Sequence, residues 1–275
     1  MNKKIPVFIT LFAGLFLLIG CGNQASGNTK EKANQEDVTL KISASSIPHA
    51  ELLEFVAEDL EQEGISLDIS ITSDGIQTNQ QTADGQFDAN FFQHTPYLEQ
   101  VNEDSGLDLV NVKGIHIEPF GVYSKEIESI DQLSQNAQVA IPKDPVNFSR
   151  ALELFAANGV IELSDKKDGD YLLEDITKNE KNIEFIAVES ALLVHSLDDV
   201  EASAVNTNYA LEGGFVPLED ALIIEDSESP YVNILVTRSD NKEDAAIQKL
   251  ADALTSDKVR EFIEKEYEGA VVPAF

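Results

Sequence analysis

A dense group of aromatic side chains stands out in a chain where aromatic residues make up only 7% of the sequence. The stretch Asp88–Glu99 reads DANFFQHTPYLE and brings Phe92, His94 and Tyr97 close together. If its first part is extended, Phe91 points to the face opposite Phe92. Side chains of these types at this spacing can form one wall of a ligand cleft. The alternative is an ordinary hydrophobic core with one hydrogen-bonded histidine.

Arg150 is the cation best suited to binding a carboxylate. Arginines are scarce in this chain, which has only Arg150, Arg238 and Arg260. Arg150 lies near the start of a helix predicted over 147–158, where free N–H groups and the helix dipole also favour an anion. A guanidinium can grip a carboxylate with two parallel hydrogen bonds. The alternative is a surface arginine in an ion pair.

The sequence lacks the usual patterns of enzymes. It has no Ser-His-Asp set in a nucleophile-elbow pattern, no glycine-rich phosphate loop and no zinc-protease signature. The single cysteine, Cys21, permits no disulfide within the chain and no thiolate metal cage. His49, His116 and His195 do not have the spacing of metal ligands. We therefore expect no enzymatic activity, no cofactor and no metal.

The net charge of −31 excludes one large class of partners. Binding to nucleic acid requires clustered Lys and Arg to neutralise phosphates, so we expect no nucleic-acid partner. The acid excess indicates a well-solvated, self-repelling surface. An acidic metal-storage surface is the alternative, although no calcium-loop pattern is present.

The first twenty residues have the pattern of a secretion signal. Lys3 and Lys4 precede an apolar run from Ile5 to Ile19, which is too short for a comfortable membrane span. The run ends in Leu-Ile-Gly-Cys21, which resembles a bacterial lipobox. We predict a signal peptide at 1–20 and lipidation of Cys21. An ordinary signal peptide or an anchor helix with a chance cysteine is the alternative.

The segment 21–37 is predicted to be a lipidated cysteine followed by a flexible tether. Its polar sequence has no aromatic or branched apolar residue and cannot fold by burial. Sixteen flexible residues give a root-mean-square reach of roughly 20–24 Å. The predicted location is the extracytoplasmic face of the cell membrane, held by lipid chains.

From Val38 onward, short strands alternate with helices. This alternation predicts an α/β fold with mostly parallel sheets, and the length of the body allows two lobes. Strands are predicted at 38–44, 67–71, 87–92, 120–123, 139–141, 183–188, 202–205 and 233–237. Helices are predicted at 48–63, from 95 onward, 147–158, 244–254 and 257–267, with Gly159 as a left-handed cap.

Seven stretches, in order, carry a resemblance to a known family. They are SSIPHAELLEFV (45–56), ADGQFDANFFQHTPYL (83–98), EPFGVYSK (118–125), VAIPKDPVNFSRAL (139–152), HSLDDVEASAVNTNYAL (195–211), DSESPYVNILVTR (226–238) and YEGAVVPAF (267–275). On these the chain resembles the methionine-binding lipoproteins of bacterial ABC importers, the NlpA-type substrate-binding family. The resemblance extends from the lipobox to the last residue.

The resemblance implies a two-lobed, type II periplasmic-binding-protein fold with a ligand cleft between the lobes. The chain would cross between lobes near 120–124 and 231–236. One lobe would hold 38–120 plus 236–275, and the other 121–235. Hinge closure would then bury the ligand.

The resemblance also assigns site residues. It implies that Arg150 binds the ligand carboxylate, and that Asn208 and Asn233 hold the amino-acid head group, since an amide both donates and accepts hydrogen bonds. Without the resemblance, these asparagines would be read as turn or strand-end residues. His94, Tyr97 and Phe92 would face the ligand side chain, because a thioether packs well against aromatic rings. Tyr209 is expected to be a packing residue.

Two stretches depart from the family pattern. Gly75 stands where family members often carry a tyrosine that lines the side-chain pocket. The lost ring leaves either a space or a place for a neighbour. Phe148 and Ser149 replace two glycines usual before the arginine, so Phe148 either fills that space or faces solvent. The head-group site looks intact, whereas the side-chain site looks altered.

The predicted function is therefore delivery of a small ligand rather than catalysis. The protein would bind L-methionine, a related amino acid or a methionine-containing peptide, and pass it to an ABC permease and its ATPase. The alternative is a surface adhesin or interaction lipoprotein that has kept the fold and lost transport.

Overall fold

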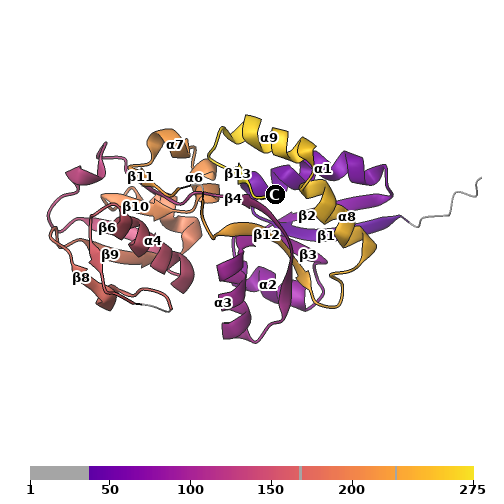
Figure 1. Ribbon diagram of the computed structural model, residues 1–275, viewed down its shortest axis with the longest axis horizontal. Helices are drawn as coiled ribbons and strands as arrows, with labels where there is room; N and C mark the ends of the chain where they lie inside the picture. Colours follow the sequence, from indigo (N-terminus) through magenta and orange to yellow (C-terminus); the bar gives the residue numbers. More distant parts are fainter. Residues whose placement is uncertain (1–36, 167–168, 227) are drawn as a thin grey trace, which may run out of the picture. The chain divides into compact units, whose positions relative to one another are not determined.

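The computed structural model describes residues 37–166, 169–226 and 228–275 (Figure 1). The predicted signal peptide, Cys21 and the tether up to residue 36 lie outside the described residues. None of the described helices is long and apolar enough to span a membrane. Helices and strands alternate along the chain, which confirms the predicted α/β class.

Six strands form the first sheet, in the order β13-β4-β12-β3-β1-β2. The sheet is mixed: β1 pairs in parallel with β2 and β3, whereas β12 pairs antiparallel with β3 and β4. The prediction of mostly parallel sheets was wrong, because β12 re-enters this sheet from the second one and runs against both neighbours. The bounds are β1 (Val38–Ala44), β2 (Ile65–Ile71), β3 (Ala89–His94), β4 (Leu109–Ile117), β12 (Val232–Arg238) and β13 (Val272–Pro273).

Five strands form the second sheet, in the order β11-β5-β10-β6-β9. It is mixed as well, with β6 parallel to β9 and β10, and β5 antiparallel to β10 and β11. The bounds are β5 (Gly121–Tyr123), β6 (Gln138–Pro142), β9 (Glu184–Val188), β10 (Ala202–Val205) and β11 (Ile223–Ile224); β7 (Glu162–Leu163) and β8 (Ile176–Lys178) pair separately. The chain leaves the first sheet after β4 and returns at β12. We call the parts built on the two sheets the first and second lobes.

Helices cover both faces of the first sheet. On one face lie α1 (Glu51–Glu61), α8 (Ala245–Leu254) and α9 (Asp257–Tyr267); α2 (Gly75–Ala83) and α3 (Thr95–Ser105) lie on the other (Figure 1). Strand β12 shows why both faces are covered. Its Leu235 joins the core under α1 and α8, whereas Ile234 and Val236 pack with Leu98 of α3. Successive strand residues point to opposite faces, so an apolar run needs cover on both.

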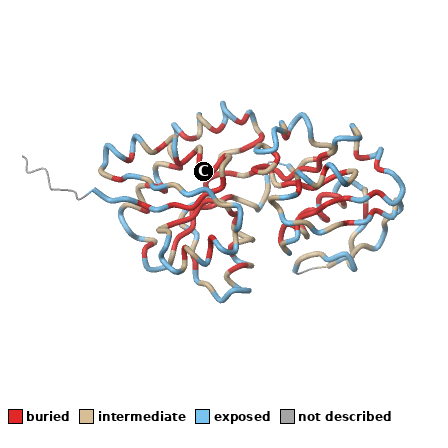
Figure 2. The backbone as a smooth tube through the Cα atoms, turned by 180° about the vertical axis from the view of Figure 1, so that it is seen from behind, coloured by how far each residue is buried: buried red, intermediate tan, exposed pale blue. Residues whose placement is uncertain are grey.

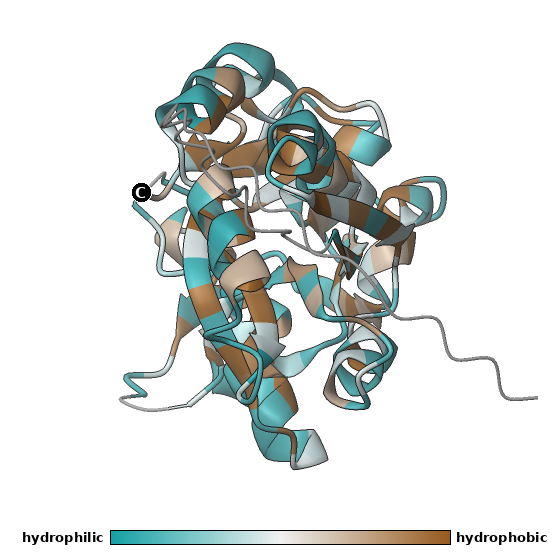
Figure 3. Cartoon of the chain, turned by 90° about the vertical axis from the view of Figure 1, so that its right-hand side faces the viewer, coloured by the Kyte–Doolittle hydropathy of each residue, from teal (hydrophilic) through white to brown (hydrophobic). Residues whose placement is uncertain are grey.

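The second lobe has its own cores. Leu152 and Phe155 of α4 (Pro145–Ala157) pack on one side of its sheet. Leu193 of α5 (Leu193–Ser196) and Ala210 of α6 (Thr207–Glu212) pack with Tyr123 in a separate cluster, near α7 (Pro217–Asp220). Short helical turns complete the fold: η1 (Ser46–Ala50), η2 (Ile130–Gln132), η3 (Leu173–Asp175) and η4 (Ser190–Leu192). Buried residues follow the strands of both lobes (Figure 2), and the helices are banded hydrophilic and hydrophobic (Figure 3).

Two helix starts position the cleft residues. Helix α3 begins directly after β3, where Nδ1 of His94 accepts a hydrogen bond from the Tyr97 backbone N–H at 3.2 Å. Helix α4 begins after Asp144, whose carboxylate accepts from the Asn147 backbone N–H at 2.9 Å. Each cap satisfies an N–H group that the first helical turn leaves free. Gly159 follows α4 with φ +71°, which confirms the predicted left-handed cap.

The sequence prediction missed α2 and β4, together with the short elements α5, α6, α7, β7, β8, β11 and β13. The buried residues of α2 are polar: Thr78, Asn79 and Thr82. The side chain of Asn79 exchanges hydrogen bonds with that of Gln93 on β3, so this helix packs through amides and shows no apolar period. Strand β4 carries register shifts in its pairing with β12, which disturb the alternation that identifies a strand.

Candidate functional site

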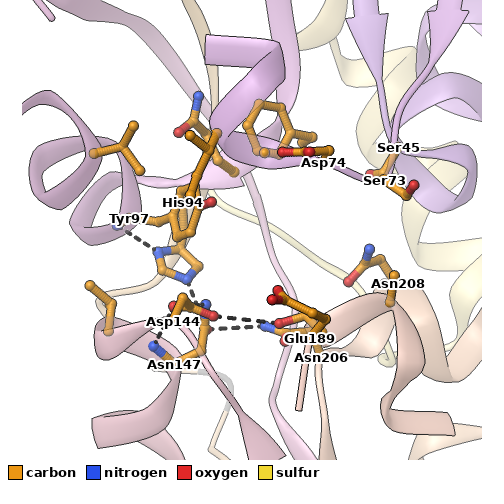
Figure 4. A pocket seen from close by; sticks show the side chains of 18 of the residues that line it. Ser45, Ser73, Asp74, His94, Tyr97, Asp144, Asn147, Glu189, Asn206 and Asn208 are labelled. Atoms are coloured by element: carbon orange, nitrogen blue, oxygen red, sulfur yellow. Dashed lines mark hydrogen bonds between the residues drawn. The ribbon is translucent and has the colours of Figure 1, made fainter. Parts of the chain in front are cut away.

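A cavity of about 880 Å³ lies between the two lobes. Its lining includes all six residues predicted to contact a ligand: Phe92, His94, Tyr97, Arg150, Asn208 and Asn233. Both lobes contribute, since α2, α3 and β3 lie on one side and α4 and α6 on the other (Figure 4). The antiparallel pairing of β12 with β3 places Asn233 opposite His94.

Glu118 is a site residue that sequence reasoning missed. It lines the cavity, is only 6% exposed and lies just beyond β4. Its Oε1 is 2.7 Å from Nε2 of His116, and its Oε2 accepts from the backbone N–H of Asn208 at 2.9 Å. Burial raises its pKa, an effect that His49, the Asn208 N–H and Arg150 oppose. Glu118 therefore offers a hydrogen-bonded acceptor in a buried part of the cavity.

Two buried histidines flank this carboxyl group. Burial lowers the pKa of His49 to about 4 and that of His116 to about 3, so both are neutral at pH 7. Within the described residues Nδ1 of His116 has no partner. A proton on that atom would be an orphaned buried donor, so the proton belongs on Nε2, which donates to Glu118.

His49 fixes the orientation of Asn233. Its Nδ1 lies 2.7 Å from Oγ of Ser45, and its Nε2 lies 3.0 Å from Oδ1 of Asn233. An amide oxygen can only accept, so Nε2 of His49 is the donor and Nδ1 accepts from the serine hydroxyl. The NH₂ group of Asn233 makes none of the hydrogen bonds found among the described residues. It is therefore available to a ligand, as a donor.

Arg150 is buried, and another side chain already engages it. Its Nε and Nη2 donate to the two carboxylate oxygens of Glu225 at 2.7 and 2.6 Å, and Nη2 also donates to the Glu118 carbonyl oxygen at 3.0 Å. Its guanidinium carbon stands 4.0 Å from the ring centre of Tyr231. The Arg150 side chain is 3% exposed and the Glu225 side chain 15%, so this is not the surface ion pair considered as an alternative. Of the three side-chain nitrogens of Arg150, Nη1 alone makes no hydrogen bond to the described residues.

His94, the histidine of the aromatic wall, forms a hydrogen bond across the cleft. Nε2 of His94 lies 3.1 Å from Oδ1 of Asn147 on α4, and its Nδ1 caps α3 (Figure 4). Burial and the Arg150 charge lower its pKa to about 3. Both ring nitrogens are thus in use, and His94 offers a ligand its ring rather than a hydrogen bond.

Neighbouring rings take the place of a side chain at Gly75. A Cβ there would lie 2.6 Å from Oη of Tyr97 and 2.8 Å from Cε2 of Phe92. Phe148 does not fill the space, because it packs against the second-lobe core and is not part of the cavity lining. Phe91 points away from the cavity into the first-lobe core, which confirms its predicted orientation.

The three side chains His49, His116 and Glu118 also form a group of metal-ligand types. Their ligand atoms lie within 4.8 Å of one another, and all three are buried. Neutral imidazoles and a carboxylate are common zinc ligands. Here, however, hydrogen bonds already join Nε2 of His116 to Glu118 and Nε2 of His49 to Asn233. The hydrogen bonds account for this cluster without a metal.

Comparison with known proteins identifies the family. The NlpA lipoprotein model matches residues 40–275. The chain belongs to the NlpA lipoprotein family. This membership confirms the family predicted from the seven stretches and the two-lobed periplasmic-binding fold that it implied.

Relatives and solved structures are similar over nearly the whole chain. The methionine-binding lipoprotein MetQ of Bacillus subtilis is 36% identical over 96% of this chain and 98% of its own. The D-methionine-binding lipoprotein MetQ of Escherichia coli K12 is 37% identical over 99% of both chains. A nutrient-binding protein from Burkholderia cenocepacia, solved bound to methionine, is 35% identical with a TM-score of 0.82, covering 86% of this chain and all of that one.

Proposed function

We propose that this NlpA-family protein binds L-methionine or a related amino acid outside the cytoplasm and delivers it to an ABC importer. The observation that carries the proposal is the pairing, in one cavity, of a buried acceptor and a free amide donor beside an aromatic wall. Glu118, Asn233 and the rings of Phe92 and Tyr97 supply these parts. A zwitterion with an apolar side chain is complementary to this arrangement. The relatives named for methionine support it.

The ammonium group of the ligand would bind Glu118. Its carboxyl group is flanked by neutral histidines, and the nearby guanidinium is neutralised by Glu225. A cation from the ligand would therefore compensate the buried negative charge. Asn208, whose backbone N–H already bonds Glu118, would hold the head group from the second lobe.

The ligand carboxylate would bind the NH₂ group of Asn233 and Nη1 of Arg150. Glu225 would then hold the guanidinium in place rather than compete for it, since it uses Nε and Nη2. The ligand side chain would lie against Phe92, His94 and Tyr97. Sulfur against an aromatic ring contributes roughly 0.3–1.5 kcal/mol.

Delivery requires two moving lobes, an anchor and a partner. Because β12 (Val232–Arg238) pairs within the first sheet, we place the boundary before it and assign the first lobe to 38–120 plus 232–275 and the second to 121–231, with hinge closure around the ligand. A lipid on Cys21 would hold the protein on the extracytoplasmic face of the cell membrane. An ABC permease with its ATPase would receive the ligand, and the binding protein would perform no chemistry.

A thermal-shift panel on residues 22–275, refolded to remove carried ligand, tests the proposal. L-methionine, D-methionine and other amino acids would be compared at a hundred times their dissociation constants, where a ligand stabilises by roughly 2.7 kcal/mol. That corresponds to about 5–10 °C in a protein of this size. We expect a shift with L-methionine. No shift with any amino acid, from well-folded protein, would contradict the proposal and favour an interaction lipoprotein.

A further inference from the structure

The cleft does not end at its aromatic wall. We propose that it continues into a polar groove between α2 and α3 that binds the far end of a long amino-acid side chain. The preferred ligands are then α-amino acids whose side chains extend past the length of methionine and end in a hydrogen-bonding, charged group. This inference rests on the proposed function, because it requires the head group to bind at Glu118 and Asn233.

One face of α3 defines the direction of the groove. Tyr97, Gln100, Val101 and Asp104 all line the cavity, at the i, i+3, i+4 and i+7 positions of a single helical stripe. Seven residues at 1.5 Å each carry this stripe about 10 Å beyond Tyr97. Because His94 caps the helix at the other end and pairs with Asn233, the stripe runs away from the head-group residues.

The first turns of α2 form the facing side. Ile76, Gln77 and Gln80 line the same cavity. This side begins at Gly75. Because Gly75 has no side chain, the rings of Phe92 and Tyr97 can pack directly against the start of α2. The same cavity is lined by these rings and by Gln77, Gln80 and Gln100, so the aromatic wall does not close its end.

The volume of the cavity exceeds what a single short amino acid fills. At about 30 Å³ per non-hydrogen atom, the value for liquid water, the nine such atoms of methionine occupy roughly 270 Å³. The cavity measures about 880 Å³, although part of it is the mouth. Space remains for a ligand about twice as long.

The chemistry of the groove selects a polar end. Its amides, Gln77, Gln80 and Gln100, can donate and accept, while Asp74 and Asp104 accept only. Lys143 reaches the cavity from the second lobe and pairs with Glu189 at 2.8 Å. An ammonium group at the end of the ligand would bind Asp74 and Asp104. A carboxylate group there would bind the amides of the three glutamines. An apolar tail would instead remove water from these groups without replacing its hydrogen bonds.

Calorimetric titration of residues 22–275 with four ligands tests the inference. L-methionine is the short ligand, and L-cystathionine adds a second ammonium–carboxylate end through a thioether. S-hexyl-L-homocysteine has a long apolar tail, and L-methionylglycine is extended through its backbone instead. We expect L-cystathionine to bind at least as tightly as L-methionine, and the other two more weakly.

Variants of the groove assign the effect to its residues. Asp104→Asn and Gln100→Ala should each weaken L-cystathionine roughly threefold to tenfold, the range for one hydrogen bond, and change L-methionine less than twofold. Glu103→Gln neutralises the neighbouring residue, which does not line this cavity, and should change neither. Binding of L-methionine with L-cystathionine at least tenfold weaker, or tighter binding of the dipeptide, would overturn the inference and leave the proposed function standing. Failure of all four ligands would overturn both.

Discussion

At the scale of single residues, the charge of the cleft depends on hydrogen bonds that the sequence does not reveal. Glu118 begins the family stretch 118–125, but nothing in that stretch indicates that its carboxyl group is buried in the cleft. Only the fold brings His116 and the Asn208 N–H to its two oxygens. The six predicted residues could be named because the family motifs contain them, and all six line the cavity. The pairing of Arg150 with Glu225 joins residues 75 positions apart and could not.

Replacing Glu118 with Gln should change how stability depends on pH. Burial raises the pKa of Glu118 above its ordinary 4.5, so the folded protein holds this proton more tightly than the unfolded chain. The group's contribution is therefore fully present below pH 4.5 and is lost as pH rises. The melting temperature of E118Q minus that of the wild type should increase between pH 4.5 and 7. A difference that stays constant over this range would contradict the raised pKa.

Gly75→Ala tests whether the missing side chain sets the position of the aromatic wall. The new Cβ requires the rings of Phe92 and Tyr97 to move by a few tenths of an ångström or more. We expect ligand affinity to fall several-fold, with little change in melting temperature, because alanine favours a helix by up to about 1 kcal/mol over glycine. Adding Tyr97→Phe removes the closest contact and should restore part of the lost affinity. Purely additive effects in this double-mutant cycle would show that the contact is unimportant.

At the scale of elements, apolar periodicity predicted the strands and helices that bury apolar faces. Strand β10 and helix α9 agree with prediction to the residue, because each presents a regular apolar pattern to a core. Helix α2 was missed because its buried face consists of threonine and asparagine. This same helix lines the cleft, so apolar periodicity failed to predict an element that contributes to the site.

The start of α4 offers a direct test of the cap that Asp144 provides. Asp144→Ala removes the acceptor for the Asn147 backbone N–H and should cost about 1–2 kcal/mol in the free energy of unfolding. Asp144→Asn keeps an acceptor of the same shape and should cost less than about 0.5 kcal/mol. Urea denaturation of the two variants measures the difference. Equal losses would mean that charge, and not the cap, stabilises this helix start.

At the scale of the whole molecule, a hydrogen bond between His94 and Asn147 joins the lobes across the cleft. Within the described residues the chain passes between the two sheets twice, after β4 and before β12, so hinge motion needs few backbone changes. Sequence periodicity could not place this contact, because it depends on how the lobes meet. The family resemblance supplied the two-lobed fold, and the contact itself emerges only from the structure.

Asn147→Ala should shift the ligand-free protein toward a state in which the two lobes are further apart. Loss of the cross-cleft bond should increase the radius of gyration of the ligand-free protein in X-ray scattering. It should also weaken ligand binding roughly threefold to tenfold, the range for one hydrogen bond. Asn206→Ala is the control for the radius of gyration, because it removes a contact to Asn147 that lies within the second lobe; Asn206 itself lines the cavity, so its affinity is not compared. The same radius and affinity in N147A as in the wild type would contradict the role given to this bond.

The central claim is that Glu118 binds the ammonium group of an α-amino acid. Calorimetry with L-methionine and 4-(methylsulfanyl)butanoate, which is methionine without its amino group, tests it most directly, in the wild type and in E118Q. In the wild type the compound without the ammonium should bind on the order of 100-fold more weakly, as expected for a lost buried charge pair. In E118Q the two compounds should differ little. Equal affinities in the wild type would contradict the claim.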